Sequence, residues 1–408
     1  MPSFAYQAKD ATGKSVNGVI EAENERMLRA KLREMNYYVT GITQKQTGGL
    51  NTDIGQYLGQ FRGVSEQALV VFARQFATMI NAGLAMVRCL DVLSIQTEDP
   101  VLKPVITSIR REVEGGSTLA AALGKHPKVF SPLFINMVRA GELGGILDDV
   151  LNRLATFLEK DFNLKKKVKS AMTYPSVILI MAVLIVLFLV VFIMPTFVEL
   201  FRGMNMTLPV PTKILIAFTN GARNPYMFIP TLIGLVIGFL LFRRYTSTPR
   251  GRRQYDSFKL KLPVFGMLIR KVAISRFCRT LGTLLQSGVP IMQALEIVGK
   301  ASGNEVVAET VIKVRESVRE GESIAVPLQL SGLFPPLVTQ MVAVGEETGN
   351  LDGMLAKISD FYDTEVEYML ASLTSLLEPL LILIMGFIVG FIVISVFLPL
   401  YQIIGNIK

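Results

Sequence analysis

Three long apolar runs dominate the pattern of hydrophobic and polar positions along the chain. The first, 170–198, contains no charged side chain, and the second, 226–242, is bounded by arginines. The third begins after Glu378 and stays uncharged up to the terminal Lys408. Each run reaches or exceeds the roughly 17 residues that a membrane-spanning helix needs. The pattern predicts transmembrane helices over 172–195, 225–242 and 379–402.

The chain also repeats itself. At an offset of 205 residues, FARQFATMINAG (72–83) aligns with FCRTLGTLLQSG (277–288), and apolar residues recur at i, i+4, i+7 and i+8 in both. This spacing predicts an amphipathic helix in each copy. One residue is then lost, and FSPLFINMVRAGELGGILD (130–148) aligns with FPPLVTQMVAVGEETGNLD (334–352). The alignment continues to the membrane, so each copy is a helical module that ends in a span.

Helix ends can be assigned in both copies. Gly83 and Gly288 follow the first amphipathic helix, where glycine commonly ends a helix. Thr118 and Ser323 precede a short apolar stretch, and a hydroxyl in that position predicts an N-cap. In the second copy, Pro290 is expected to open the next helix.

A corner of pattern G-E-x-x-G-x-L-D occurs in both copies. Its members are Gly141, Glu142, Gly145, Leu147 and Asp148, then Gly345, Glu346, Gly349, Leu351 and Asp352. The favoured interpretation is structural: the first glycine ends one helix, and the acidic groups face the positive N-terminus of the next helix. The alternative is that the acidic corner binds a partner protein, and all ten residues are candidates for that contact.

The patterns together define the domain organisation. Residues 1–43 contain two strand-like segments joined around residues 12–14, a helical segment at 23–36 and a closing strand, which predicts a small α+β domain. A polar linker follows at 44–63, then module 1 at 64–169, an extracytoplasmic loop at 196–224 and module 2 at 243–378. The expected fold class is therefore mainly α: a polytopic membrane protein with two tandem cytoplasmic helical-bundle modules and three transmembrane helices.

Charge sets the expected orientation. The net charge is +9, and basic clusters directly precede the first span and follow the second: Lys165, Lys166, Lys167 and Lys169, then Arg243, Arg244, Arg250, Arg252 and Arg253. Such clusters favour the cytoplasmic side and contact lipid headgroups. The first residues also lack the pattern of a cleaved signal peptide. We expect a cytoplasmic N-terminus, an extracytoplasmic C-terminus, contact with membrane lipid and no nucleic-acid partner.

The sequence contains no recognisable set of catalytic residues. It has no P-loop, no G-x-S-x-G and no H-E-x-x-H motif. Cys89, Cys278 and His126 lie far apart, so we expect buried thiols, no catalytic residue, no metal and no cofactor. A helical transporter is a remote alternative, since it would require polar groups in mid-membrane that the runs lack.

Several residues at the spans are candidates for packing or partner contact. Tyr174 and Pro175 stand at the mouth of the first span, and Glu378 and Pro379 at the mouth of the third. The second span contains Gly234-xxx-Gly238 and the third Gly386-xxx-Gly390, a spacing that lets another helix approach closely. The glycine faces fit either internal packing or a homo-oligomer, of which a dimer is one form.

These motifs in this order resemble the type II secretion F / type IV pilus platform family. The resemblance rests on the tandem corners, the Tyr174-Pro175 and Glu378-Pro379 pairs, LPVPT (208–212) and the opening F-x-Y-x-A-x-D, and it covers essentially the whole chain. It implies a bacterial inner-membrane platform that couples a hexameric cytoplasmic ATPase to insertion of pilin subunits into a fibre, or to their removal. Inner-membrane alignment proteins are further implied partners.

The resemblance leaves the system open between a type IV pilus, which we favour, and a type II secretion or DNA-uptake pseudopilus. It carries the partner contact onto Gly141, Glu142 and Gly145 and onto Gly345, Glu346 and Gly349. Tyr174 departs from the repeat, because the matching position in the second copy is Glu378. The two spans are therefore not expected to act equivalently.

Overall fold

The computed structural model describes residues 3–9, 15–21, 27, 38–45, 63–203 and 209–406. Contacts within the chain divide it into two compact units. The first comprises residues 1–65 with 98–104, and the second comprises residues 66–97 with 105–408.

The first unit contains a three-stranded antiparallel sheet in the order β2-β1-β3. Its strands are β1 (Ser3–Lys9), β2 (Ser15–Glu21) and β3 (Tyr38–Lys45). The three predicted strands are thus present, and β3 runs two residues into the predicted linker. The helix predicted at 23–36 lies outside the described residues except for position 27, and so does the linker from residue 46 to residue 62.

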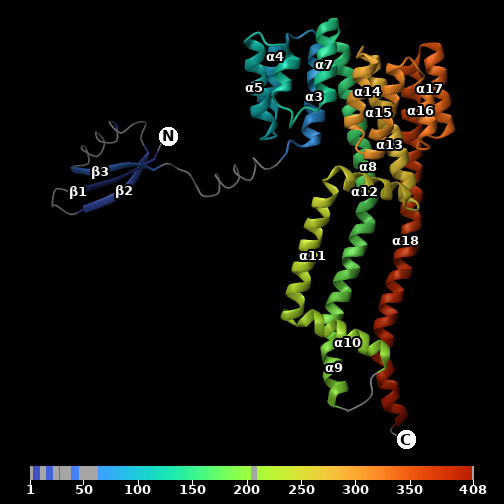
Figure 1. Ribbon diagram of the computed structural model, residues 1–408. Coiled ribbons are helices and arrows are strands. Elements are labelled where there is room, and N and C mark those ends of the chain that lie inside the picture. The colour runs from blue at the N-terminus through green and yellow to red at the C-terminus, as the bar shows by residue number, and fades with distance from the viewer. Residues whose placement is uncertain are drawn as a thin grey trace. The chain divides into compact units, whose positions relative to one another are not determined.

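Module 1 is a bundle of short helices that belongs to the second unit except for residues 98–104 (Figure 1). Its helices are α3 (Glu66–Asn81), α4 (Met86–Gln96), α5 (Leu102–Glu114), α6 (Leu119–Gly124) and α7 (Pro132–Gly144), followed by the long α8 (Leu147–Phe188). Phe72 and Phe76, one turn apart on α3, are buried, as the helical spacing predicts. Their rings lie 5.7 Å apart, and Phe72 packs on Phe130 at 6.0 Å, which in turn meets Phe134 at 4.9 Å.

Module 2 repeats this arrangement. Its helices are α12 (Pro249–Lys261), α13 (Phe265–Gln286), α14 (Ile291–Ala301), α15 (Glu305–Arg319), α16 (Ala325–Leu330) and α17 (Pro336–Thr348), followed by the long α18 (Leu351–Asn406). Phe277 and Phe334, which the repeat aligns with Phe72 and Phe130, pack edge to face at 5.1 Å. The structure therefore confirms two tandem helical modules with equivalent cores.

The predicted helix ends can be compared with the structure. Gly83 and Gly288 have φ of 83° and 78°, the left-handed conformation that glycine adopts without strain. The Thr118 side chain accepts a hydrogen bond from the Ala121 amide at 3.2 Å, as an N-cap does. In the second copy, the Ser323 hydroxyl accepts from the Ala325 amide at 3.0 Å, although Ile324 occupies the cap position. Pro290 is the N-cap of α14 and not its first residue.

Among the described residues, three helices are long and apolar enough to cross a membrane. The first is formed by α8, the five-residue π-helix η1 (Leu189–Ile193) and the start of α9 (Met194–Gly203); the second is α11 (Pro225–Thr246); the third lies in α18. Their large apolar side chains, such as Leu184, Phe239 and Phe387, are more than half exposed or nearly so. Such exposure is expected where lipid is the solvent, and the chain is a polytopic membrane protein.

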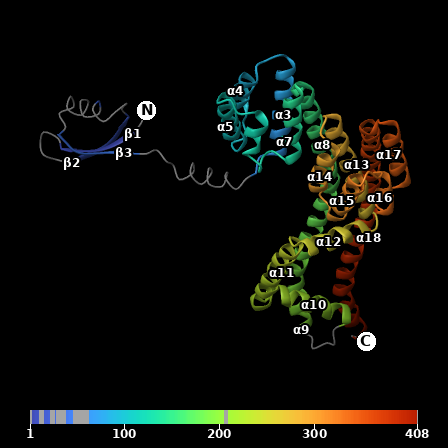
Figure 2. The same ribbon diagram turned by 45° about the horizontal axis from the view of Figure 1, so that its top comes forward.

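The segment predicted as a loop at 196–224 is mostly helical, which corrects the sequence-based expectation. It contains α9 and α10 (Val210–Arg223), which lie at the end of the spans remote from the modules (Figures 1 and 2). On α10, Thr212, Leu215 and Thr219 are buried. The Thr212 hydroxyl donates a hydrogen bond of 2.6 Å to the Ser395 carbonyl of α18. The run 210–223 is too short to span a bilayer, and this shortness concealed its helical period.

Candidate functional site

The first glycine of each corner does not end a helix, contrary to the prediction. Helices α7 and α17 continue past Gly141 and Gly345 and end before Gly145 and Gly349, which both have φ of 67°. Gly141 and Gly345 are instead buried where the following helix passes. A Cβ at Gly141 would lie 3.0 Å from the Val150 Cβ, and one at Gly345 would lie 3.0 Å from the Leu351 Cα. Glycine is needed there for close packing and not for its conformational freedom.

The glutamate of each corner caps a helix in its own module. Glu142 accepts hydrogen bonds from the amides of Leu119 and Ala120, at 2.5 and 2.9 Å, at the start of α6. Glu346 accepts from the Ile324 amide at 2.6 Å and from the Ser323 hydroxyl at 2.6 Å. A carboxylate at a helix N-terminus satisfies free amides and complements the helix dipole. The capped helices are therefore α6 and α16, which come earlier in the chain than the corner, and not α8 and α18, which follow it.

The remaining corner residues begin the long helices. Leu147 and Leu351 are the first residues of α8 and α18, and Asp148 and Asp352 lie in their first turns, where acidic groups were predicted. Between the two glycines, module 1 exposes Leu143, whose side chain is 84% exposed. The matching residue of module 2 is the exposed Glu347, so the two corners present different surfaces.

The two modules meet along a seam formed by α8 of module 1 with α13 and α18 of module 2. The seam has an apolar core of five buried residues, Leu164, Leu268, Val366, Leu370 and Leu373. Below it, toward the membrane, Val168 and Met172 of α8 pack against the same cluster. Hydrophobic burial of this kind holds the two modules together, but it is non-directional and does not determine which charged residues meet across the seam.

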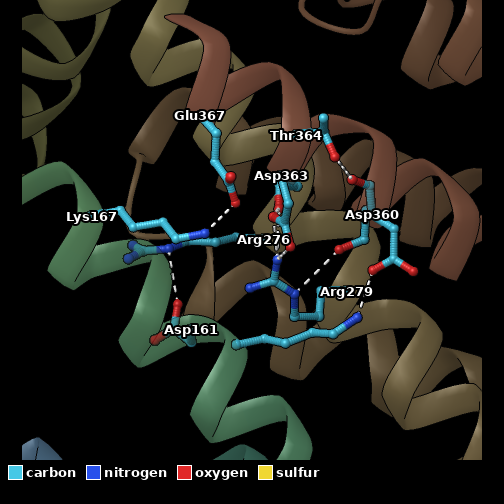
Figure 3. Close-up of polar contacts among 11 residues, drawn as sticks. Asp161, Lys167, Arg276, Arg279, Asp360, Asp363, Thr364 and Glu367 are labelled. Atoms are coloured by element: carbon cyan, nitrogen blue, oxygen red, sulfur yellow. Dashed lines mark hydrogen bonds and ion pairs between the residues drawn. The ribbon is translucent and has the colours of Figure 1, made fainter. Parts of the chain in front are cut away.

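Ion pairs also cross the seam (Figure 3). Lys160 of α8 contacts Asp360 of α18 at 2.6 Å, and Lys167 of α8 contacts Glu367 of α18. A third pair joins Asp161 of α8 to Arg276 of α13 at 3.2 Å, and Arg153 donates to the Gln286 carbonyl at 2.7 Å. These contacts join residues more than a hundred positions apart in the chain, so no local pattern could have predicted them.

The seam is not a symmetric contact between two equal copies. The repeat aligns Lys160 with Thr364 and Asp360 with Thr156, neither of which is charged. Each of these pairs therefore has no equivalent at the positions that the repeat aligns with it. Two copies of module 1 could not form these pairs with each other, because one member of each pair (Asp360, Glu367 or Arg276) belongs to module 2 and has no charged counterpart at the aligned position of module 1. The duplicated modules have diverged so that each fits the other.

Each module also contains an arginine–carboxylate pair that the sequence analysis missed. Arg74 of α3 binds Glu159 of α8 with two contacts of 2.6 and 2.5 Å, and the bond lowers the pKa of Glu159. At the aligned positions, Arg279 of α13 binds both oxygens of Asp363 of α18. The repeat aligns both charges, Arg74 with Arg279 and Glu159 with Asp363, so the sequence did contain a signal for these pairs.

The two pairs differ in their surroundings. The side chains of Arg74 and Glu159 are 36% and 34% exposed, whereas those of Arg279 and Asp363 are 5% and 22% exposed. Ser275 donates to Asp363 at 2.5 Å. The Arg279 Nη1 atom is buried without a hydrogen-bond partner among the described residues. Arg279 also lines a groove of about 200 Å³ at the seam.

Tyr174 and Glu378 stand where the first and third spans begin, and they differ although the repeat aligns them. Their side chains contact each other. The Tyr174 hydroxyl lies 3.5 Å from a carboxylate oxygen of Glu378, a long hydrogen bond. Pro175 and Pro379 follow directly in α8 and α18, and both helices continue through them. Each proline lacks the amide that would bond one turn back, so the helices are weakened at the same level.

The glycine pairs of the spans lack a packing partner among the described residues of this chain. Nothing among the described residues lies within 4 Å of a Cβ built on Gly234, Gly238, Gly386 or Gly390. These helix faces are open in the single chain. A role for them in contacts with another chain stays a prediction.

The cysteines and the histidine that the sequence analysis considered lie outside the seam. Cys89 and Cys278 are buried free thiols, and burial raises the pKa of both, which keeps them protonated. The His126 ring lies 3.3 Å from the Ser108 hydroxyl. Within the described part of the chain, no group of three potential metal ligands is found.

The fold and the seam define a membrane protein with a duplicated helical module, each copy continuous with a span. The sequence matches the family described as "Type II secretion system (T2SS), protein F" over residues 72–195 and 277–399. Residues 1–43 match "Type II secretion system protein F, N-terminal domain". Both repeat copies are thus covered, and the chain belongs to the type II secretion system protein F family.

Characterised relatives are similar over their full length. The type IV pilus assembly protein PilC of Thermus thermophilus is 44% identical over all of both chains. PilC of Myxococcus xanthus is 42% identical over 99% of this chain and 96% of its own. The type II secretion system protein F of Vibrio cholerae is 34% identical over 98% of each.

Proposed function

We propose that this chain is the inner-membrane platform protein of a type IV pilus assembly machine. In this role it couples a cytoplasmic hexameric ATPase to the insertion of pilin subunits into the fibre or to their removal. The names of the two relatives above 40% identity support a pilus. A type II secretion or DNA-uptake pseudopilus is the alternative, supported by the relative named for secretion.

One observation carries the mechanical part of the proposal: the last helix of each module is also its span. α8 has 42 residues and α18 has 56 residues, a length of about 84 Å for α18. A bilayer core is only about 30 Å thick, so most of α18 lies outside it. A displacement of a module is therefore carried into the membrane by continuous helix and not by a flexible connection.

The proposal assigns a place to each end of the molecule. The N-terminal domain and both modules are cytoplasmic, and α9, α10 and the C-terminus are on the other side, as the basic clusters beside the first two spans indicate. Pilin subunits and alignment proteins would contact the spans, and the open glycine faces would bind pilin or a second copy of the chain. The proposed role is mechanical and not catalytic.

Deletion of the gene tests the choice between pilus and secretion. We expect surface fibres, counted by electron microscopy, to disappear while pilin is still produced, and the plasmid-borne chain to restore them. Export of secreted enzymes should be unchanged. Normal fibres combined with enzymes that stay inside the cell would instead support the secretion alternative. Normal fibres combined with normal export of the enzymes would contradict both functions.

The ATPase contact is proposed at the exposed side of the module 1 corner. Leu143 is 84% exposed there, while Glu142 is occupied in capping α6. Charge reversal of Glu142 would remove the cap together with any docking contact. The neighbouring residue therefore gives the cleaner test.

Leu143→Glu should leave the thermal stability of the chain unchanged and reduce co-purification of the ATPase about tenfold or more, because an exposed apolar contact is replaced by a charge. The matched variant Glu142→Ala should destabilise the module by about 1–2 kcal/mol, because two amides of α6 lose their acceptor. Undiminished ATPase binding by Leu143→Glu would contradict docking at this corner.

A further inference from the structure

Helix α12 connects the second span to module 2 through two tight turns. A Cβ on Gly251 would lie 2.1 Å from the Tyr245 carbonyl oxygen at the end of α11. A Cβ on Gly266, at the start of α13, would lie 2.3 Å from the Leu260 carbonyl oxygen. Only glycine fits at either turn, so α12 is held across the end of α11 (Figures 1 and 2).

One face of α12 contacts α15 of module 2. Arg253 contacts Glu309 at 2.8 Å, and Arg252 contacts Glu305 at 3.7 Å. Asp256 is 4% exposed and accepts a hydrogen bond of 3.0 Å from the Glu305 amide at the start of α15. Arg252 and Arg253, two of the cations that the sequence analysis expected beside lipid headgroups, thus also join α12 to α15.

The other face of α12 is turned toward the second span. Gly251, Tyr255, Phe258 and Leu262 recur at i, i+4, i+7 and i+11, which places them on one side of the helix. Gly251 abuts the end of α11, and the Tyr255 ring meets Phe242 of α11 edge to face at 5.5 Å. Phe258 lies on this same side and is 61% exposed. It therefore faces the region into which the span descends.

Cations border this apolar stripe. Arg250 and Lys261 are exposed, near the two ends of α12. Their long side chains can reach phosphate groups while an aromatic ring enters the layer below. The span fixes the depth of the helix, because α11 ends three residues before α12 begins.

We propose that α12 binds the anionic bilayer surface on the module side, with Phe258 at the boundary between headgroups and acyl chains and Arg250 and Lys261 on lipid phosphates. Module 2 then rests on the membrane through α12, in addition to its own span. Any movement of module 2 must carry α12 along the lipid surface. The interaction depends on bilayer charge, since two of its contacts are electrostatic.

The chain has no tryptophan, which permits a direct test. Phe258→Trp introduces a single tryptophan into the full-length protein, reconstituted into vesicles of phosphatidylcholine and phosphatidylglycerol, and its emission can be excited apart from that of the tyrosines. Lipids brominated near the headgroup should quench its emission about twofold, and lipids brominated near the chain end should quench it less. Leu330→Trp, at a position of module 2 that is 83% exposed, should not be quenched. Phe239→Trp, 63% exposed on α11, should be quenched by the deep label.

Two outcomes would overturn the proposal. If Phe258→Trp behaves like Leu330→Trp, α12 does not enter the membrane, and its stripe belongs to a protein partner or a second copy. If Arg250→Gln with Lys261→Gln leaves the quenching of Phe258→Trp in anionic vesicles as strong as it is without these two changes, the charge dependence is wrong. The proposal expects quenching to fall in the anionic vesicles and to change little in pure phosphatidylcholine.

Discussion

Replacement of Arg279 by methionine is expected to destabilise the chain by about 3–5 kcal/mol, the usual loss when one partner of a buried ion pair is removed. Arg279 is 5% exposed and binds both oxygens of Asp363. Without the guanidinium, the Asp363 carboxylate keeps a hydrogen bond from Ser275 but has no counter-charge from this arginine. Little water can reach the Asp363 carboxylate to solvate its charge in place of the lost guanidinium.

The repeat supplies a matched control. Arg74→Met removes the equivalent arginine of module 1, where both side chains of the pair are about one-third exposed. Water and counter-ions can solvate Glu159 there, so the expected loss is about 1 kcal/mol or less. Both variants are compared by thermal unfolding of the purified full-length chain in one detergent.

A double variant separates the ion pair from the packing around it. Arg279→Met with Asp363→Leu leaves no unpaired charge and should recover most of the stability lost in Arg279→Met. Equal losses in Arg279→Met and Arg74→Met, or no recovery in the double variant, would contradict the role assigned to burial. Such a result would mean that the two modules tolerate the loss of charge in the same way.

The parts of this fold that could be predicted from sequence are those set by local patterns. Apolar runs gave the spans, the helical period gave the module cores, and the repeat gave the duplication. Gly83 and Gly288 could be assigned because a helix end depends on neighbouring residues only. The family resemblance was confirmed over both copies and the N-terminal region.

The parts that could not be predicted depend on residues distant in the chain. Glu142 caps a helix that begins 23 residues earlier, and Lys160 meets Asp360 only after both modules have folded. Gly141 was assigned to a helix end because packing against Val150 has no sequence signature. The arginine–carboxylate pairs are different: their charges were aligned by the repeat and were visible in principle.

The second prediction of large effect concerns the helical connection itself. Lys169, Ser170 and Thr173 are exposed on α8 where the seam ends and the first span begins, so they can be changed without disturbing a core. Glycine at all three would weaken the helix by about 3 kcal/mol relative to alanine at the same three positions. The two triple variants lose the same side chains and the same charge. They differ only in the stiffness of the helix between module and membrane.

The central claim is that continuous helix carries movement of the modules into the membrane, and fibre assembly by these two variants tests it most directly. With equal amounts of each variant in the membrane, the alanine variant should assemble fibres as the unaltered chain does. The glycine variant should lose most of them, because the module can then move without moving its span. Normal fibre numbers from the glycine variant would contradict the account.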